Sequence, residues 1–132
     1  MVTIVLMTHS SKRNLVIVRA GQSSLHNQWL DLPYERRDFD IIVSYFDETA
    51  FSCHKAQAGV SAFFVKGGKW DGLYKTILNS GNLLETYDYF WLPDDDIACT
   101  GTDVNKIFQN MADHNIRVGQ PSLTLDSYFT HF

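Results

Sequence analysis

Blocks of apolar residues with two different spacings alternate along this chain. Short β-branched and aromatic runs predict strands, and they fall at residues 14–19, 39–46, 60–65 and 87–92. Between the last two runs the apolar spacing lengthens to three and four residues, which predicts an amphipathic helix from Trp70 with Leu73, Tyr74, Ile77 and Leu78 inward. Strands that alternate with helices predict a mainly parallel sheet in a three-layer α/β sandwich.

Weaker patterns fill the remaining segments. Residues 22–24 can cap a short helix in which Leu25, Trp29 and Leu32 share a face, until Pro33 ends it. Residues 49–59 predict a loop or a frayed helix because they show little periodicity. Thr102 is expected to cap a last helix, whose inward side chains are Val104, Ile107, Phe108 and Met111. Residues 2–7 form either a short strand or a leader, and a final run covers residues 116–125.

The most informative segment is residues 87–97, where an apolar run ends in three consecutive aspartates. Because the run is apolar on both faces, it predicts a central strand. In an extended segment Asp94 and Asp96 point to one side and Asp95 to the other, and such a D-x-D pair suits Mg²⁺ or Mn²⁺. The alternative is an acidic turn in which Asp96 or a neighbour caps the next helix.

Other polar segments also follow predicted strands, at the sheet edge where α/β proteins bind ligands. They are Arg19-Ala20-Gly21, Asp47-Glu48 and Lys66-Gly67-Gly68-Lys69. The last is either a phosphate site at a helix N-terminus or a glycine turn with solvated lysines, and it does not match a P-loop. Surface or capping positions are expected for His26, His54 and His114, whereas His131 lies close behind Asp126-Ser127-Tyr128.

Composition narrows the class of protein. A chain of 132 residues that is 45% hydrophobic and 14% aromatic predicts one domain with a core of its own. The net charge of −4 and the scattered basic residues argue against nucleic-acid binding. Met1–Met7 is too short for a membrane span and lacks signal-peptide features, which predicts a cytoplasmic protein. No zinc or disulfide spacing is present, so Cys53 and Cys99 are expected to be free thiols.

The order of several motifs resembles an uncharacterised family of plant and bacterial proteins. The motifs are Lys69-Trp70, the Tyr-Asp-Tyr-Phe-Trp-Leu-Pro-Asp-Asp-Asp run at 87–96, an amphipathic helix and Gly119-Gln120-Pro121-Ser122-Leu123. Plant members carry the label "lysine-ketoglutarate reductase trans-splicing related", which does not describe an activity. The resemblance covers about residues 13–131. The family is in turn similar to the nucleotide-sugar-binding half of GT-A glycosyltransferases, whose D-x-D holds a divalent cation on the donor diphosphate.

The resemblance implies a metal-dependent, glycosyltransferase-like domain. Asp94 and Asp96 match the two D-x-D acids and would hold Mn²⁺ or Mg²⁺, while Asp95 stands where plant members have Glu. The nucleoside pocket would be lined by Arg19, Gly21 and Asp47, and Lys69 would lie near the diphosphate. The implied partners are a nucleotide-sugar donor and a saccharide or other hydroxyl acceptor. The catalytic residues, the sugar and the stereochemical outcome stay open.

One departure from the family is the end of the chain at Phe132, since family members continue well beyond the final histidine. The departure predicts a domain truncated at its C-terminus that binds donor without turnover. Such a domain would expose apolar surface and form a homodimer or a concentration-dependent aggregate. Two alternatives stay open. One is a non-catalytic binding or interaction domain. The other is Mg²⁺-dependent phosphoryl transfer or hydrolysis, for which only Asp47 and Glu48 offer further acids.

Overall fold

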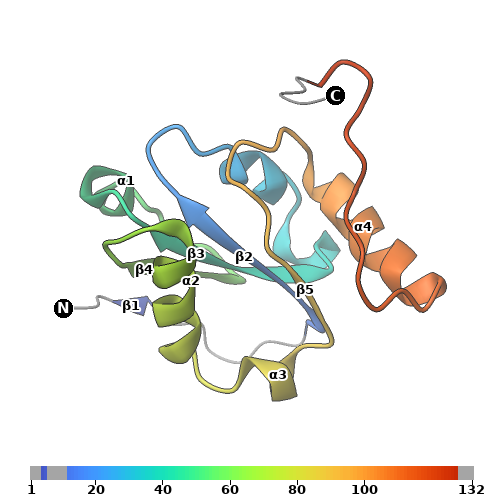
Figure 1. Ribbon diagram of the computed structural model, residues 1–132, viewed down its shortest axis with the longest axis horizontal. Helices are drawn as coiled ribbons and strands as arrows, with labels where there is room; N and C mark the ends of the chain where they lie inside the picture. The colour runs from blue at the N-terminus through green and yellow to red at the C-terminus, as the bar shows by residue number, and fades with distance from the viewer. Residues whose placement is uncertain (1–3, 6–11, 128–132) are drawn as a thin grey trace.

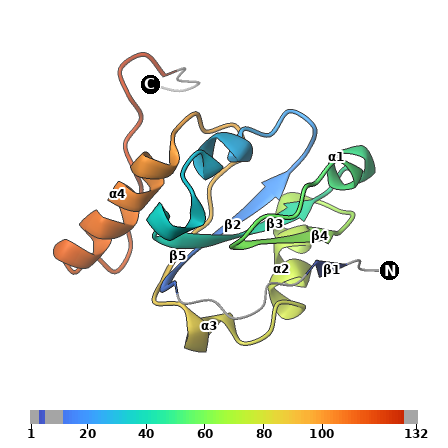
Figure 2. The same ribbon diagram turned by 180° about the vertical axis from the view of Figure 1, so that it is seen from behind.

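The computed structural model describes residues 4–5 and 12–127, in which one sheet is covered by helices on both faces (Figures 1 and 2). The strands are β1 (Ile4–Val5), β2 (Asn14–Ala20), β3 (Phe39–Tyr45), β4 (Val60–Phe64) and β5 (Tyr89–Trp91). The helices are α1 (Glu48–Ser52), α2 (Lys69–Leu78), α3 (Leu83–Thr86) and α4 (Gly101–Asp113), with 3-10 turns η1 (His26–Leu30) and η2 (Tyr34–Arg36). The predicted α/β class is confirmed.

The strand order is β1-β4-β3-β2-β5, in which only β1 runs antiparallel to its neighbour. Each parallel connection passes through helical or irregular segments that cover a face of the sheet (Figures 1 and 2). Counted from β2, the chain first adds strands on one side and then returns to place β5 on the other. The order of the parallel strands therefore reverses between β2 and β5, and open α/β sheets bind ligands beyond the carboxyl ends of the strands at such a point.

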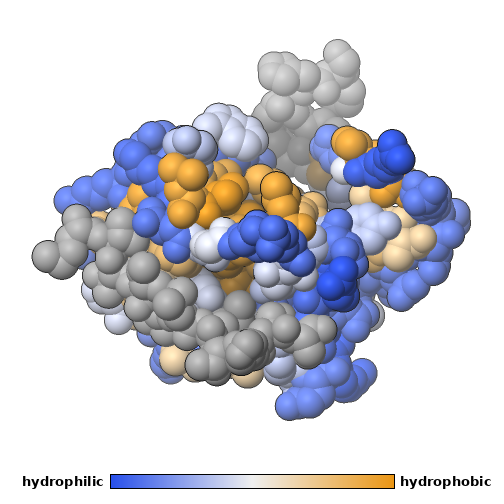
Figure 3. Space-filling model, turned by 90° about the horizontal axis from the view of Figure 1, so that it is seen from below, coloured by the Kyte–Doolittle hydropathy of each residue, from blue (hydrophilic) through white to orange (hydrophobic). Residues whose placement is uncertain are grey.

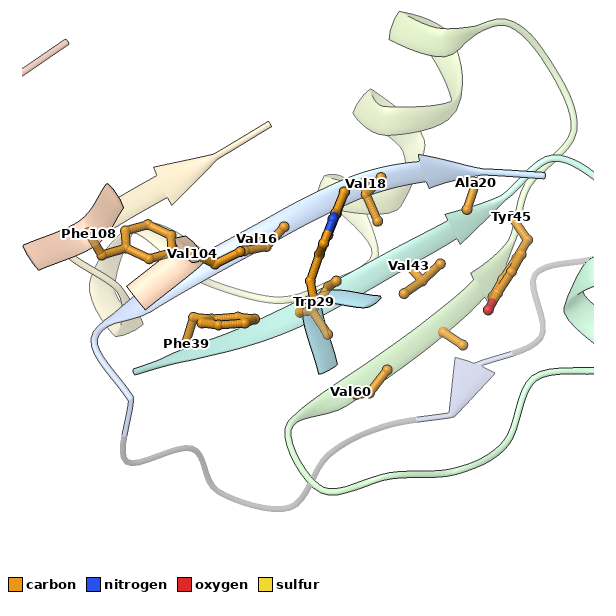
Figure 4. Packing of buried hydrophobic residues seen from close by; sticks show 12 residues of the cluster. Val16, Val18, Ala20, Trp29, Phe39, Val43, Tyr45, Val60, Val104 and Phe108 are labelled. Atoms are coloured by element: carbon orange, nitrogen blue, oxygen red, sulfur yellow. The ribbon is translucent and has the colours of Figure 1, made fainter. Parts of the chain in front are cut away.

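The two faces of β2 carry two separate halves of the core. Val16, Val18 and Ala20 point to the face covered by η1 and α4. They share a cluster with Trp29, Val104 and Phe108 of these helices and with buried residues of β3 and β4 (Figure 4). Leu15 and Ile17 point to the opposite face, which is covered by α2 and α3. Strands with two buried faces read as continuous apolar runs, which explains why β2 and β3 were easy to locate from the sequence.

The prediction that the acid-bearing strand is central is wrong. β5 pairs with β2 alone among the described strands and lies at one edge of the sheet. The apolar character of β5 has a different cause, which is that other side chains pack against its aromatic rings. The Trp91 ring centroid lies 5.5 Å from that of Trp29, and the ring of Phe90 meets that of Tyr87 edge-on. Aromatic packing on both faces of β5 thus gives an edge strand the continuous apolar sequence that is typical of a central strand.

Two helix predictions also need correction. The helix expected after Gly21 is a short 3-10 turn, η1, in which Trp29 is fully buried and donates a hydrogen bond to the Ile97 carbonyl. α4 begins at Gly101, and its cap is Thr100 rather than Thr102, because Thr100 and Asp103 form a reciprocal capping box. The alternative in which Asp96 or a neighbour caps this helix is therefore excluded.

The surface around α2 and α3 carries large apolar side chains. Figure 3 shows apolar residues gathered beside polar ones on the face seen from below. Exposed side chains on the two helices include Trp70, Tyr74, Leu78 and Leu84. None of the helices in the described part of the chain has the length and apolar character needed to cross a membrane.

Candidate functional site

The loops at the carboxyl ends of the parallel strands are tied to one another. The amide of Phe46, after β3, donates to Ala20 at the end of β2, and that of Val65, after β4, donates to Tyr45. The side chain of Gln22 reaches Asp47 at 3.2 Å. These bonds fix the relative positions of the loops at the edge of the sheet where the sequence predicted the site.

The acidic loop is anchored to the loop after β2 through its middle residue. The Asp95 carboxylate accepts a hydrogen bond from the Gly21 amide at 3.2 Å, and the Asp95 carbonyl accepts one from Leu25 at 2.7 Å. The hydroxyl of Ser24 also lies 3.5 Å from that carbonyl. The three aspartates therefore have different tasks, and Asp95 is the one that holds the loop in place.

The other two acids of the triplet are exposed to solvent. Asp94 forms an ion pair with Lys69, the first residue of α2. Asp96 makes no hydrogen bond or ion pair with any residue that the structure describes. The two D-x-D acids are thus accessible at the surface, one already compensated by a cation from the protein and the other open to solvent.

The side chain of Arg19, which was assigned to the nucleoside pocket, lies on the face of the sheet that α2 covers. Its guanidinium is buried beneath α2 and donates to the carbonyls of Val65, Gly67 and Ser44 and to the Ser44 hydroxyl, at 2.5 to 3.3 Å. A side chain at Gly72 would clash with it, since an added Cβ would lie 2.3 Å from Cζ. The described contacts of Arg19 therefore hold the β4–α2 loop.

Gly21 and Asp47, the other two residues assigned to the nucleoside pocket, lie at the carboxyl edge. Gly21 is buried, and an added Cβ would lie 2.5 Å from the Phe46 ring, so that only glycine fits without a shift. Asp47 caps α1 by accepting a hydrogen bond from the Ala50 amide at 2.7 Å. Its second oxygen accepts the bond from Gln22, so that both carboxylate oxygens have hydrogen-bond donors within the protein.

A cavity of about 470 Å³ opens between the ends of β2 and β3, on the face of η1 and α1, and Gly21 forms part of its wall. Side-chain amides, hydroxyls and imidazoles line it, including Gln22, Ser24 and His54, together with Lys55. No carboxylate is among the described residues of its wall. The lining suits a neutral or anionic ligand rich in hydrogen-bonding groups.

Four residues of this wall form a hydrogen-bonded cluster, which the sequence did not predict. The Tyr45 hydroxyl lies 3.1 Å from His54 Nδ1 and 3.4 Å from His26 Nε2. Ser24 Oγ lies 2.7 Å from the other nitrogen of His26. The expected surface position is wrong for His26, which is buried, and correct for His114, which is exposed. The position of Tyr45 at the carboxyl end of a strand was the one available signal.

The pair of Ser24 and His26 is poorly suited to general-base catalysis at neutral pH. Burial, assisted by His54, lowers the pKa of His26 to about 4 against the opposing charge of Asp95. A general base works best when its pKa lies near the operating pH, so His26 is a weak proton acceptor for a serine hydroxyl. The amide of His26 also donates to Ser24 Oγ, which is a local turn that shapes the start of η1.

Acid should therefore destabilise the fold through this cluster. The folded-state pKa of His26 lies below its usual value of 6.5, and burial lowers the pKa of His54 as well. Neutral histidine thus contributes stability that is full above pH 6.5 and is lost as the pH falls towards 4, by roughly 3 kcal/mol for His26. Urea unfolding at a series of pH values should show this slope.

A matched pair of variants tests the assignment of this acid sensitivity. His26→Gln should flatten the slope between pH 6.5 and 4, whereas His114→Gln should keep it because His114 is exposed. An unchanged slope in His26→Gln would show that other groups cause the acid sensitivity.

Asp94 and Asp96 are the candidate ligands for a divalent cation. Within the described residues, no three His, Cys, Asp or Glu side chains are grouped to hold a metal unaided. Mg²⁺ is commonly bound by one or two carboxylates and completes its shell with water and substrate phosphates. Asp94 and Asp96 supply two such carboxylates, and this donor set does not fit a metal held by protein groups alone. Residues 95–96 form a turn, so the extended segment expected to place both acids on one side is wrong. Cys53 and Cys99 are free thiols, as predicted.

Comparisons with protein-family models, with curated proteins and with solved structures found no match to this chain.

Proposed function

We propose that this domain binds a nucleoside diphosphate sugar together with Mg²⁺ or Mn²⁺ and belongs to a glycosyltransferase of the GT-A type. The observation that carries the proposal is the hydrogen bond between Gly21 and Asp95. It joins the wall of the cavity to the acidic loop, at the point where the strand order reverses. A nucleoside in the cavity would thus have its diphosphate directed to the exposed carboxylates.

Different residues of the chain would bind the cation, the nucleoside and the diphosphate. Asp94 and Asp96 would hold the cation, which neutralises the charge that develops on the leaving nucleoside diphosphate. The amide and hydroxyl groups of the cavity would bind the nucleoside, with Gly21 allowing close approach of the backbone. Lys69 would contact the diphosphate from the start of α2, where the helix N-terminus adds positive potential.

Calorimetric titration with UDP, GDP, CDP and ADP, each with Mn²⁺ and with EDTA, tests the proposal. At least one of the four should bind with Mn²⁺ and bind much more weakly in EDTA, because the metal bridges the acids to the diphosphate. Binding that is equal under both conditions, or absent with all four, would overturn it.

The exposed apolar side chains of α2 and α3 favour a second candidate, an interaction domain without catalysis. Exposed apolar patches of this kind mark protein interfaces. This alternative gains support if none of the nucleotides binds and if sedimentation shows self-association that rises with protein concentration. Phosphoryl transfer with two metals is less suited to the site, because Asp47 is engaged in capping α1.

A further inference from the structure

One ion pair spans the candidate site and joins two residues that would serve different ligands. Lys69, at the start of α2, pairs with Asp94 on the acidic loop. The side chain of Lys69 is 38% exposed and that of Asp94 is 65% exposed, so that a ligand from solvent can reach both partners. The Lys69 ammonium also lies 5.1 Å from the centre of the Trp70 ring, which gives it a second stabilising neighbour.

Both partners are held on anchored backbone. Arg19 donates to the carbonyls of Val65 and Gly67 and so fixes the loop that leads to Lys69. The bond from Gly21 to Asp95 fixes the loop that carries Asp94. The pair therefore connects two defined positions.

Each ligand of the proposed function competes for one partner of this pair. A divalent cation at Asp94 competes with the Lys69 ammonium for the same carboxylate. A diphosphate at Lys69 competes with Asp94 for the same ammonium. Whichever ligand binds first therefore releases the residue that the second ligand needs.

We propose that Lys69 is a positioning residue that couples the binding of the cation to the binding of the diphosphate. This inference rests on the proposed function. Lys69 occupies Asp94 while the site is empty and turns to the diphosphate when the cation takes that carboxylate. The coupling is reciprocal, since each ligand must raise the affinity of the other by the same factor. The pair also balances the charge of Asp94 until both ligands are present.

The first test measures the nucleoside diphosphate without any metal. In EDTA, Asp94→Asn should bind the diphosphate about two- to fivefold more tightly than the wild type, because an exposed ion pair of this kind contributes up to ~1 kcal/mol, which corresponds to about fivefold in affinity. Asp96→Asn is the matched control. It removes the same charge from the same loop without releasing Lys69, so its metal-free affinity should rise less.

The second test measures Mn²⁺ without nucleotide, by the paramagnetic resonance signal of the free ion. Lys69→Met should bind Mn²⁺ about two- to fivefold more tightly, since the competing ammonium is gone. Lys66→Met is the matched control, because Lys66 lies in the same loop over the Phe64 ring and makes no ion pair with a described residue. It should leave Mn²⁺ affinity close to that of the wild type.

The outcomes separate this inference from the function on which it rests. If the wild type binds nucleotide with Mn²⁺ but each variant behaves as its control does, Lys69 does not couple the two ligands and the proposed function stands. If the wild type binds neither Mn²⁺ nor any nucleoside diphosphate, both proposals fail. Gains in both variants over their controls support the coupling.

Discussion

Asp96→Asn is expected to abolish Mn²⁺-dependent nucleotide binding, with an affinity loss on the order of 100-fold. The reason is that Asp96 is exposed and has no partner among the described residues, so that its full charge is available to a cation. Asparagine keeps the shape of the side chain and removes the charge. Titration of nucleoside diphosphate in the presence of Mn²⁺, side by side with the wild type, measures the loss.

Two other aspartates provide the controls for this experiment. Asp95→Asn should do less damage, because the amide oxygen of asparagine can still accept the hydrogen bond from Gly21. Asp88 lies at the other end of β5 and pairs with Arg13. Asp88→Asn should therefore leave nucleotide binding unchanged. Equal nucleotide affinity in the wild type and in Asp96→Asn would refute the assignment of Asp96 to the cation.

Local patterns in the sequence were sufficient to locate β2, β3, β4 and α2. The apolar runs of β2 and β3 were recognisable because both faces of these strands are buried. α2 was recognisable because apolar side chains recur every three or four residues along it. The expected inward direction is right for Leu73 and in part for Ile77, and it is wrong for Trp70, Tyr74 and Leu78, which are exposed. Parallel strands place their carboxyl ends on one edge, so the clustering of the loops after β2, β3, β4 and β5 followed from the predicted topology.

The position of β5 and the neighbours of the acids could not be predicted in this way. Strand order is a property of the whole sheet, and the aromatic residues of β5 give the same local pattern at an edge as in the centre. The tasks of the three aspartates depend on Gly21 and Lys69, which lie far away in the sequence. Likewise, Tyr45 meets His26 and His54 only because β3 ends between η1 and the residues after α1.

Arg19 shows what the alternation of side chains along a strand can predict about a residue's position and what it cannot. Residues of β2 point alternately to the two faces, so Arg19 had to share a face with Leu15 and Ile17. The sequence does not say which helices cover that face or where the cavity lies. A buried arginine near a predicted site therefore resembled a ligand contact, whereas the structure surrounds its guanidinium with backbone carbonyls.

Arg19→Met is accordingly expected to destabilise the protein by about 3 kcal/mol. Arg19 is 6% exposed, and its guanidinium serves three carbonyls and the Ser44 hydroxyl. Methionine fills much of the volume but leaves these acceptors without their donor. Urea unfolding followed by the fluorescence of the tryptophans, which include the fully buried Trp29, measures the change.

Arg19→Lys supplies the graded control for this prediction. Lysine keeps the charge and can reach fewer of the carbonyls than the planar guanidinium, so its stability should fall between those of the wild type and Arg19→Met. Loss of the bonds to Val65 and Gly67 should also loosen the loop before Lys69, and nucleotide affinity should fall moderately in the folded variants. If Arg19→Met instead keeps the stability of the wild type and loses nucleotide binding, the guanidinium serves the ligand rather than the loop.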